Sequence, residues 1–516
     1  MHRFLHSTRS IYIISMQSSA IQQRSRLISQ RTQPARDSNP VNMFKPYNLT
    51  PLDHFAPPLN LSFSLEFSLI GKNRAQALQR MEDAITRVAS KFPFLTGMVA
   101  SSTERDGNNS TLQVRPATAA EFEECPMVIT QHHSESTALT MDGKFNPALM
   151  PFPVVCPPRN PSPVLRWKAN VIGDDLHLVL CFDHRVMDGS GIFVLLRAFA
   201  AFCRDINAPG PSTTPQAQEE TRQHLEEVAS TATPRDLQWT TIPTPTSEAP
   251  DSSRVPINSP HIFDGQKIKL LLDACNSALQ SVPEKYRKDL PEMSLRPGLL
   301  VSALLGICSN RARLRAFPNE PELSSDMCIA ENLRKVLNLR RGYFGNTIAA
   351  TQSKCDGSTH PPPEILQNIH APESLGPVGP EDIWRVCNVA QSLQEASGRL
   401  DKQYAEGTIA TISHRHDWSS FRPGWGVVNF LVSDIKSASP YEDFGPLGDL
   451  RLFDFPFIAQ PGYCSIIPNL PSDSASPYPC WRLRWVLERA AMECLSNDLL
   501  FQWASTPSTA LTQAKI

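Results

Sequence analysis

The segment from Val164 to Cys203 constrains the fold of this 516-residue chain more than any other part of its sequence. Val164–Ile172 and Leu176–Phe182 are runs of apolar, β-branched and aromatic residues, which are typical of buried strands. Between them, Gly173-Asp174-Asp175 has the composition of a tight turn. The spacing therefore predicts two neighbouring strands joined by that turn.

A loop follows the second strand, and it contains the hexamer His184-Arg185-Val186-Met187-Asp188-Gly189. A helix rich in Phe, Leu and Ala is predicted after it, from Ile192 to Cys203. His184 thus stands where a buried strand enters a loop, so that a rigid scaffold can direct its imidazole into a cleft. Because the unperturbed pKa of histidine lies near neutrality, this imidazole can accept a hydroxyl proton at physiological pH.

Chance and a structural role are the alternatives for this histidine. With 13 histidines in the chain, random composition predicts about 0.05 occurrences of a histidine followed four positions later by Asp-Gly. The pattern therefore favours a functional role for His184, and a buried structural role is the remaining alternative.

Composition excludes several classes of partner. The formal net charge is -2, which gives no electrostatic basis for binding nucleic acid. No run of residues approaches the roughly 20 apolar positions of a membrane span, so we expect a soluble protein. The 12 cysteines are scattered without a CxxC pair, which favours reduced thiols over a disulfide framework or a zinc site. His132-His133 and His414-Arg415-His416-Asp417 lack accompanying ligands, so no metal is expected.

The N-terminal segment differs from the rest of the chain. Residues 1–36 contain six arginines and many serines but no lysine or acid. We expect residues 1–43 to form a basic, disordered extension and the protein to act in the cytoplasm. A mitochondrial transit peptide in residues 1–36, or a true start at Met16 or Met43, stays open.

Length favours at least two domains. We predict an N-terminal domain at residues 44–206 and a C-terminal domain at 261–516. Residues 207–260 are dense in Pro, Ser, Thr, Glu and Gln and predict a partly disordered crossover between them.

Alternating apolar positions predict a strand at Leu61–Leu69, and Asn73 can cap the helix that follows. Further expected elements are a helix around Leu299–Cys308, a strand at Leu483–Glu488 and a terminal helix with Met492, Leu495 and Leu499 on one face.

The hexamer resembles the HxxxDG signature of the BAHD acyltransferases, which belong with the chloramphenicol-acetyltransferase-like superfamily. Other segments match this family in order and spacing. They are Leu49-Thr50-Pro51-Leu52-Asp53, Lys91-Phe92-Pro93-Phe94-Leu95-Thr96-Gly97, Gly342-Tyr343-Phe344-Gly345-Asn346 and Asp443-Phe444-Gly445-Pro446-Leu447-Gly448. The long crossover at residues 207–260 resembles that of fungal trichothecene-type O-acetyltransferases more than that of plant enzymes. The same holds for Pro446-Leu447, which stands where the family usually has one Trp.

The resemblance implies an α/β fold of two similar domains, each a mixed sheet backed by helices, with a channel between them. It implies a monomer without a permanent cofactor, which takes acyl-CoA, most readily acetyl-CoA, as co-substrate. The expected reaction is acyl transfer to a hydroxyl of a small secondary metabolite. The alternatives are an N-acyltransferase, a condensation-type enzyme and a non-catalytic relative that binds CoA or a metabolite.

The resemblance also assigns roles to residues near the hexamer. His184 would be the general base. Asp188 would pair with Arg334 and support the site structurally, although an Asp188–His184 dyad is the alternative reading. Gly189 would relieve a steric or φ constraint where the loop enters the helix.

Three further residues are candidates for the site. Ser433 is a candidate to stabilise the oxyanion or bind substrate, and Asn346 a candidate to bind substrate. Asp443 is a candidate catalytic residue, although plain turn content explains its segment nearly as well.

Overall fold

A computed structural model describes most of the chain after the basic extension. The described ranges are 44–102, 111–137, 139–141, 144–154, 158–237, 239–241, 252–283, 294–320, 326–340, 342–355, 360–415, 421–423, 430–457, 461–474 and 476–506. Phe44–Ile516 forms one compact unit. The expectations for residues 1–43 lie outside the described residues.

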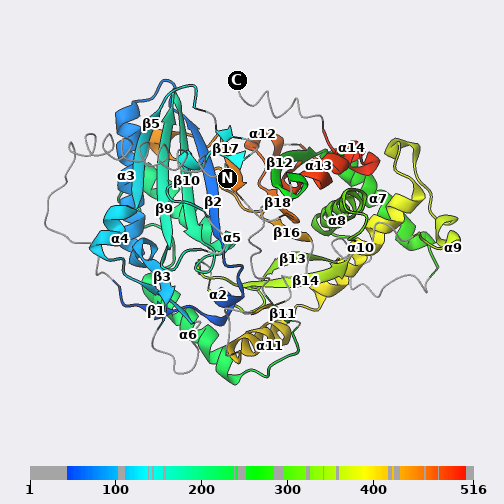
Figure 1. The fold of residues 1–516 in the computed structure, drawn as a ribbon, viewed down its shortest axis with the longest axis horizontal. Helices are drawn as coiled ribbons and strands as arrows, with labels where there is room; N and C mark the ends of the chain where they lie inside the picture. The colour runs from blue at the N-terminus through cyan, green and yellow to red at the C-terminus, as the bar shows by residue number, and fades with distance from the viewer. Residues whose placement is uncertain are drawn as a thin grey trace, which may run out of the picture. The chain divides into compact units, whose positions relative to one another are not determined.

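The first sheet has five strands in the order β17-β2-β10-β9-β5. Their bounds are Leu452–Phe457 for β17, Asn60–Ser68 for β2, Asp175–Asp183 for β10, Leu165–Ile172 for β9 and Val128–His133 for β5. β10 pairs antiparallel with β2 and β9 along its length, while β5 runs parallel to β9. The predicted pair of strands is therefore the centre of a mixed sheet (Figure 1).

Two helices cover one face of this sheet. They are α3 (Arg74–Lys91), which Asn73 caps through its side chain, and α5 (Gly189–Arg204). Leu178, Leu180 and Phe182 of β10 join the core beneath them. The alternate residues Val179 and Cys181 face a separate apolar cluster on the opposite side. Both faces of β10 are buried, which explains its nearly continuous apolar sequence.

The second sheet has six strands in the order β12-β19-β18-β16-β13-β14. Their bounds are Pro256–Phe263, Trp481–Glu488, Tyr463–Ile467, Phe430–Asp434, Asp326–Asn332 and Ile348–Lys354 in that order. The helices packed with it include α7 (Gly265–Ser281), α8 (Pro297–Ala316) and α10 (Pro380–Gly398). β13, β16 and β18 are parallel and the other pairings antiparallel, so this sheet is also mixed. The predicted α/β class with two helix-backed mixed sheets is confirmed.

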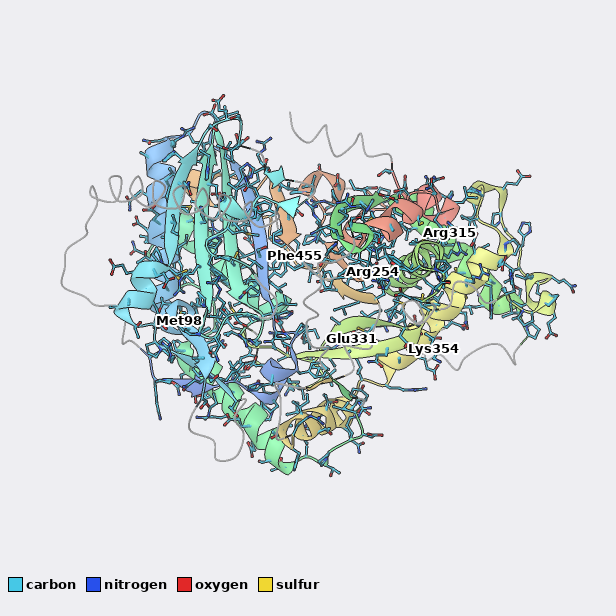
Figure 2. The ribbon with its side chains drawn as sticks, viewed as in Figure 1. Met98, Arg254, Arg315, Glu331, Lys354 and Phe455 are labelled. Carbon is cyan, nitrogen blue, oxygen red and sulfur yellow. The ribbon has the colours of Figure 1, made fainter. Side chains whose placement is uncertain are left out.

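The two sheets are joined by more than the connecting chain. Strand β17 comes from the C-terminal part of the sequence but pairs antiparallel with β2 in the first sheet. Its Phe455 is labelled in Figure 2. The ring centroid of Phe455 lies 4.7 Å from that of Phe63 of β2 and 6.2 Å from that of Tyr463 of β18. A residue range that the sequence places in the second domain thus completes the sheet of the first.

The predicted crossover contains a helix that the sequence analysis missed. Thr214 caps α6 (Pro215–Thr231), and Pro215 occupies its first turn. Its buried positions include Gln218 and Thr221, and these polar residues hide the helical period from an apolar pattern. α6 packs beside α11 (Lys402–Ser413) (Figure 1).

The expected terminal helix is wrong, because two short helices stand in its place. α13 (Arg489–Leu495) ends before Asp498, whose carboxylate caps α14 (Leu499–Ala504) by accepting from two backbone N–H groups. Leu499 is 64% exposed and shares no buried face with Met492 and Leu495. None of the helices in the described ranges is long and apolar enough to cross a membrane.

Gly191, in the first turn of α5, allows the second half of the chain to approach the first. A Cβ atom at this position would lie 2.0 Å from the backbone oxygen of Phe344. The close approach of two backbones therefore requires a residue without a side chain here.

We predict that Gly191→Ala destabilises the protein by about 3 kcal/mol because it overpacks this contact. Helix propensity alone predicts the opposite sign, a gain of up to about 1 kcal/mol. Thermal and urea unfolding followed by tryptophan fluorescence measure the change. Gly379→Ala is the matched control, since nothing lies within 4 Å of its added Cβ. Equal unfolding of both variants would contradict the prediction.

Candidate active site

His184 is held at the exit of β10 by one contact of its backbone N–H and one of its ring. Its N–H donates to the backbone oxygen of Leu59 at 3.0 Å. Its ring Nδ1 lies 3.1 Å from the backbone oxygen of Met187. Because a carbonyl can only accept a hydrogen bond, Nδ1 carries the proton in this contact. Nε2 is then the unprotonated nitrogen, which is the state a general base needs.

Burial also keeps the imidazole neutral. Desolvation lowers the pKa of His184 below its ordinary value of 6.5, and this effect exceeds the opposing influence of Asp188 and Asp183. The residue as a whole is nevertheless partly exposed. Desolvation therefore favours an uncharged ring at neutral pH.

Asp188 forms a buried ion pair with Arg334. Its two carboxylate oxygens accept from the two terminal guanidinium nitrogens at 2.8 Å each. The same oxygens accept from the backbone N–H of Gly191 at 2.9 Å and of Thr347 at 3.0 Å. These four donors occupy the acceptor positions of the carboxylate. Asp188 therefore caps α5 and binds the second half of the chain, rather than accepting from the imidazole of His184.

Arg334 fixes the segment Gly342–Asn346 as well as Asp188. Its guanidinium donates to the backbone oxygens of Tyr343 at 3.0 Å and Gly345 at 2.8 Å. Gly189 lies against the second half too, since a Cβ there would be 3.3 Å from Ile435 Cγ2. One guanidinium thus connects the hexamer to a loop some 150 residues later in the sequence.

Asn346 contacts the backbone of His184. Its side-chain nitrogen donates to the backbone oxygen of His184 at 2.8 Å and to Asp53 Oδ1 at 3.0 Å. Asp53 and Asn346 are 3% and 0% exposed. The structure therefore brings Asn346 to the catalytic histidine candidate, but on its backbone side.

Ser433 lies on β16, in register with Ser465 on β18. Burial raises the pKa of Tyr463 to about 12, against the opposing effect of hydrogen bonds from Ser465 and Ser433. Ser465 Oγ donates to the Tyr463 hydroxyl at 2.8 Å. Three hydroxyls therefore cluster on two neighbouring strands near the junction of the sheets.

Asp443 is not brought to His184. It is exposed, its Oδ1 accepts from the backbone N–H of Gly445, and its backbone oxygen accepts from Arg204 at 2.6 Å. Arg204 ends α5, whereas His184 precedes its start, and a helix of 16 residues spans about 24 Å. Asp443 shapes a turn at the far end of this helix.

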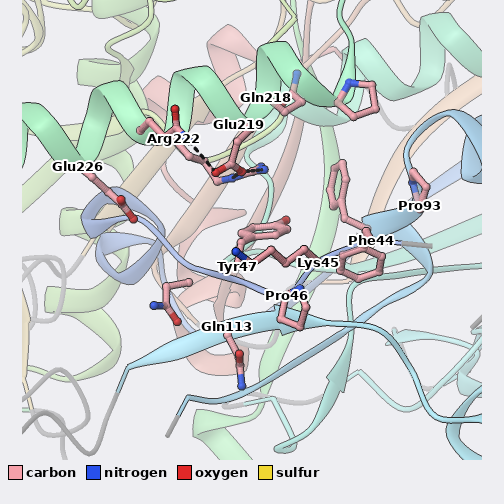
Figure 3. Close-up of a pocket in the computed structure, with 14 residues that line it drawn as sticks. Phe44, Lys45, Pro46, Tyr47, Pro93, Gln113, Gln218, Glu219, Arg222 and Glu226 are labelled. Carbon is pink, nitrogen blue, oxygen red and sulfur yellow. Dashed lines mark hydrogen bonds and ion pairs between the residues drawn. The ribbon is translucent and has the colours of Figure 1, made fainter. Parts of the chain in front are cut away.

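A pocket of about 510 Å³ lies between α6 and the first residues of the described chain (Figure 3). Arg222 lies 3.9 Å above the ring of Tyr47 and pairs with Glu219 in its wall. Gln218, another wall residue, donates to the backbone oxygen of Gly342 and accepts from the N–H of Phe344. The pocket therefore adjoins the Gly342–Asn346 segment but is not lined by His184.

Asp53 and Tyr463 are neighbours of the site that the sequence did not reveal. Asp53 carried a readable signal, because Thr50-x-x-Asp53 has the spacing of a capping box and the structure contains that motif. Tyr463 carried none, since no local motif contains it.

We predict that Asp188→Asn destabilises the protein by about 3–5 kcal/mol, because it leaves Arg334 buried without a counter-charge. Glu395→Gln, which removes the exposed pair with Arg399, is the control and should cost less than about 1 kcal/mol. Urea unfolding measures both. If Asp188→Asn unfolds like the wild type but loses turnover, the carboxylate acts in the chemistry instead.

The family model described as the trichothecene 3-O-acetyltransferase-like N-terminal domain matches residues 59–203. The chain is 26% identical over 489 residues to the communesin N16 acyltransferase of Penicillium expansum, covering 89% of this chain and 98% of that protein. It is 26% identical over 491 residues to the fumigaclavine B O-acetyltransferase of Aspergillus fumigatus, covering 89% and 97%.

Solved structures show the same fold. F. graminearum TRI101 complexed with coenzyme A and T-2 mycotoxin has a TM-score of 0.61 at 15% identity, covering 90% of this chain and 99% of that one. Vinorine synthase has a TM-score of 0.52 at 12% identity, covering 92% and 95%. In sequence and in fold the chain is therefore similar to the BAHD-like acyltransferases of the trichothecene O-acetyltransferase type.

Proposed function

We propose that this enzyme transfers an acyl group, in the first place acetyl, from a coenzyme A thioester to a hydroxyl of a small secondary metabolite. The observation that carries the proposal is the state of His184, with Nδ1 bound to a backbone oxygen and Nε2 left as a base. Relatives along almost the whole chain, named as O-acetyltransferases, support the choice of donor and acceptor.

The reaction is a direct transfer. Nε2 of His184 removes the proton of the acceptor hydroxyl while that oxygen attacks the thioester carbonyl. The new C–O bond gives a tetrahedral oxyanion, and the C–S bond then breaks. The imidazolium returns its proton to the departing thiolate, so the histidine is restored without a covalent enzyme intermediate. General base assistance of this kind contributes about 10²–10⁴-fold.

The oxyanion needs hydrogen-bond donors that are already in place. The hydroxyl cluster of Ser433, Ser465 and Tyr463 is our candidate for this role. Ser465 donates to Tyr463, which leaves the phenol proton available to a further acceptor. This assignment extends the candidate site from Ser433 alone to the cluster.

Acyl transfer to nitrogen is a second candidate, favoured by the name of the communesin N16 acyltransferase. The same base can serve both acceptors, because it removes one proton from the attacking atom in either case. The acceptor is decided by the walls of the channel rather than by His184.

We further propose that the enzyme acts as a monomer in the cytoplasm. Among the described residues the exposed large apolar side chains are Ile70, Tyr478 and Leu499, which are widely separated in sequence and form no continuous run. Eleven cysteines in the described ranges are free thiols, as expected in a reducing compartment.

We predict that His184→Ala lowers kcat by about 10²–10⁴-fold while leaving the thermal midpoint within a few degrees of the wild type. Purified protein is incubated with acetyl-CoA and a panel of alcohol and amine acceptors, and products are identified by mass spectrometry. The exposed His132→Ala is the control and should retain full turnover. Unchanged turnover of His184→Ala would refute the mechanism, and absence of coenzyme A binding by calorimetry would indicate a non-catalytic relative.

The pH dependence of kcat/KM provides a separate prediction. A protonated imidazole cannot accept a proton, so activity falls as pH drops through the pKa of His184. Because burial lowers that pKa from 6.5, the acid limb should have its midpoint below pH 6.5 and the rate should be constant through pH 7. A discontinuous mass-spectrometric assay avoids the pH dependence of thiol reagents. A midpoint above 6.5 would contradict the prediction.

A further inference from the structure

We propose that Asn346 and Asp53 are positioning residues for His184, a role that rests on the proposed function. In this proposal the amide of Asn346 fixes the backbone of the catalytic histidine from the second half of the chain. Asp53 fixes the orientation of that amide.

His184 is held from both halves of the chain. Its N–H is bound to Leu59, which precedes β2, and its ring to Met187 in its own loop. Both partners belong to the first half of the chain. Its backbone oxygen accepts from Asn346, which lies just before β14 of the second sheet. Asn346 therefore connects the histidine itself to the second half.

The orientation of the Asn346 amide is fixed by the two oxygens next to its nitrogen. The nitrogen of the Asn346 side chain lies between two oxygens, that of the His184 backbone at 2.8 Å and Asp53 Oδ1 at 3.0 Å. The carbonyl oxygen only accepts, and Asp53 Oδ1 also acts as an acceptor here, so the NH₂ group must face both. The backbone N–H of Asn346 also donates to Asp53 Oδ1, at 3.0 Å. Reversal of the amide would place oxygen against oxygen at both contacts.

Asp53 is in turn held in place by Thr50. Its other oxygen, Oδ2, accepts from the backbone N–H of Thr50 at 2.9 Å and from the Thr50 hydroxyl at 2.8 Å. Desolvation raises the pKa of Asp53, and the hydrogen bonds from Asn346 and Thr50 oppose that rise. The carboxylate is thus held on both oxygens, and it can orient Asn346 rigidly.

The Asn346 side chain leaves one of its polar atoms unsatisfied, a cost that a residue joining the two halves of the chain need not carry. Oδ1 of Asn346 is buried and has no hydrogen-bond partner among the described residues. An unsatisfied buried acceptor is unfavourable, and such groups concentrate where function demands them. A hydroxyl side chain offers one proton, whereas the two oxygens here need two donors from one atom. The amide meets that need although its oxygen stays unpaired.

The consequence for catalysis follows from the turn after His184. The backbone oxygen held by Asn346 and the oxygen of Met187 that binds Nδ1 belong to the two ends of this turn. If the His184 carbonyl is released from Asn346, the Met187 carbonyl at the other end of the turn also becomes mobile. The imidazole then loses the hydrogen bond from Nδ1 to Met187 that selects its tautomer. The expected effect is on the chemical step rather than on binding of acyl-CoA.

Asn346→Ala and Asn346→Asp are the test variants. We expect Asn346→Ala to lower kcat about 10–100-fold with less than a threefold change in KM for acetyl-CoA. Asn346→Asp keeps the size of the side chain but places an oxygen against the His184 oxygen and Asp53 Oδ1, so it should lower kcat at least as much. A lower thermal midpoint in both variants with unchanged kcat of the folded enzyme would assign Asn346 a purely structural role.

Gln218→Glu is the matched control. Gln218 is another buried amide that joins the two halves, through Gly342 and Phe344, without touching His184. We expect this variant to lower the thermal midpoint while the folded enzyme keeps its kcat. A loss of kcat equal to that of Asn346→Ala would show that any damage at this interface suffices, and would overturn the proposal.

A readout that needs no acceptor separates this proposal from the proposed function. Diethyl pyrocarbonate adds to an unprotonated imidazole nitrogen, and mass spectrometry of the His184 peptide counts the adducts. We expect one adduct in the wild type, at Nε2, and two in Asn346→Ala, where Nδ1 is released. If the wild type transfers no acyl group, this pattern still tests the positioning. A single adduct in Asn346→Ala together with unchanged kcat would overturn it.

Discussion

The ion pair between Asp188 and Arg334 is the interaction on which the rest of the site depends. It is buried, with Asp188 2% exposed, and a pair in such surroundings barely repays its desolvation through Coulomb attraction alone. Here the backbone N–H groups of Gly191 and Thr347 complete the coordination of the carboxylate. The main effect of the Asp188–Arg334 pair is therefore to select one arrangement of the two halves of the chain. Its net contribution to the free energy of unfolding is small.

This interaction also explains the spacing of the hexamer. Asp188 has to cap α5 and meet Arg334 at once, which fixes where the loop ends and the helix begins. His184 has to stay at the end of β10, where its N–H is bonded to Leu59. Three residues separate His184 from Asp188, and they form a turn whose last carbonyl, that of Met187, accepts the hydrogen bond from Nδ1. The histidine, its tautomer and the helix start are thus set by one short segment.

The parts of the fold that depend on local pattern could be predicted from the sequence. The strands before His184 and the helix capped by Asn73 follow short-range periods, and the structure has them within a few residues. Predicting α6 failed because Gln218 and Thr221 occupy its buried face. Asp53 and Asn346 are 293 residues apart in sequence. Residue patterns within one helix or strand do not predict which distant segment it contacts, so this hydrogen bond could not be predicted. The Asp443–Gly448 segment could be recognised from its residues. Its position beside Arg204, at the end of α5 away from His184, depends on the length and direction of that helix.

Strand β17 connects the two sheets through pairing and packing. It pairs with β2 of the first sheet, while β18, the next strand in sequence, pairs with β16 and β19 of the second. Phe455 of β17 packs against Phe63 of β2 and against Tyr463 of β18. Tyr463 belongs to the hydroxyl cluster proposed to stabilise the oxyanion, and β2 pairs with β10, the strand that ends just before His184. Strand pairing and aromatic packing, rather than a connecting loop, therefore join the sheet that carries the base to the strand that carries this tyrosine.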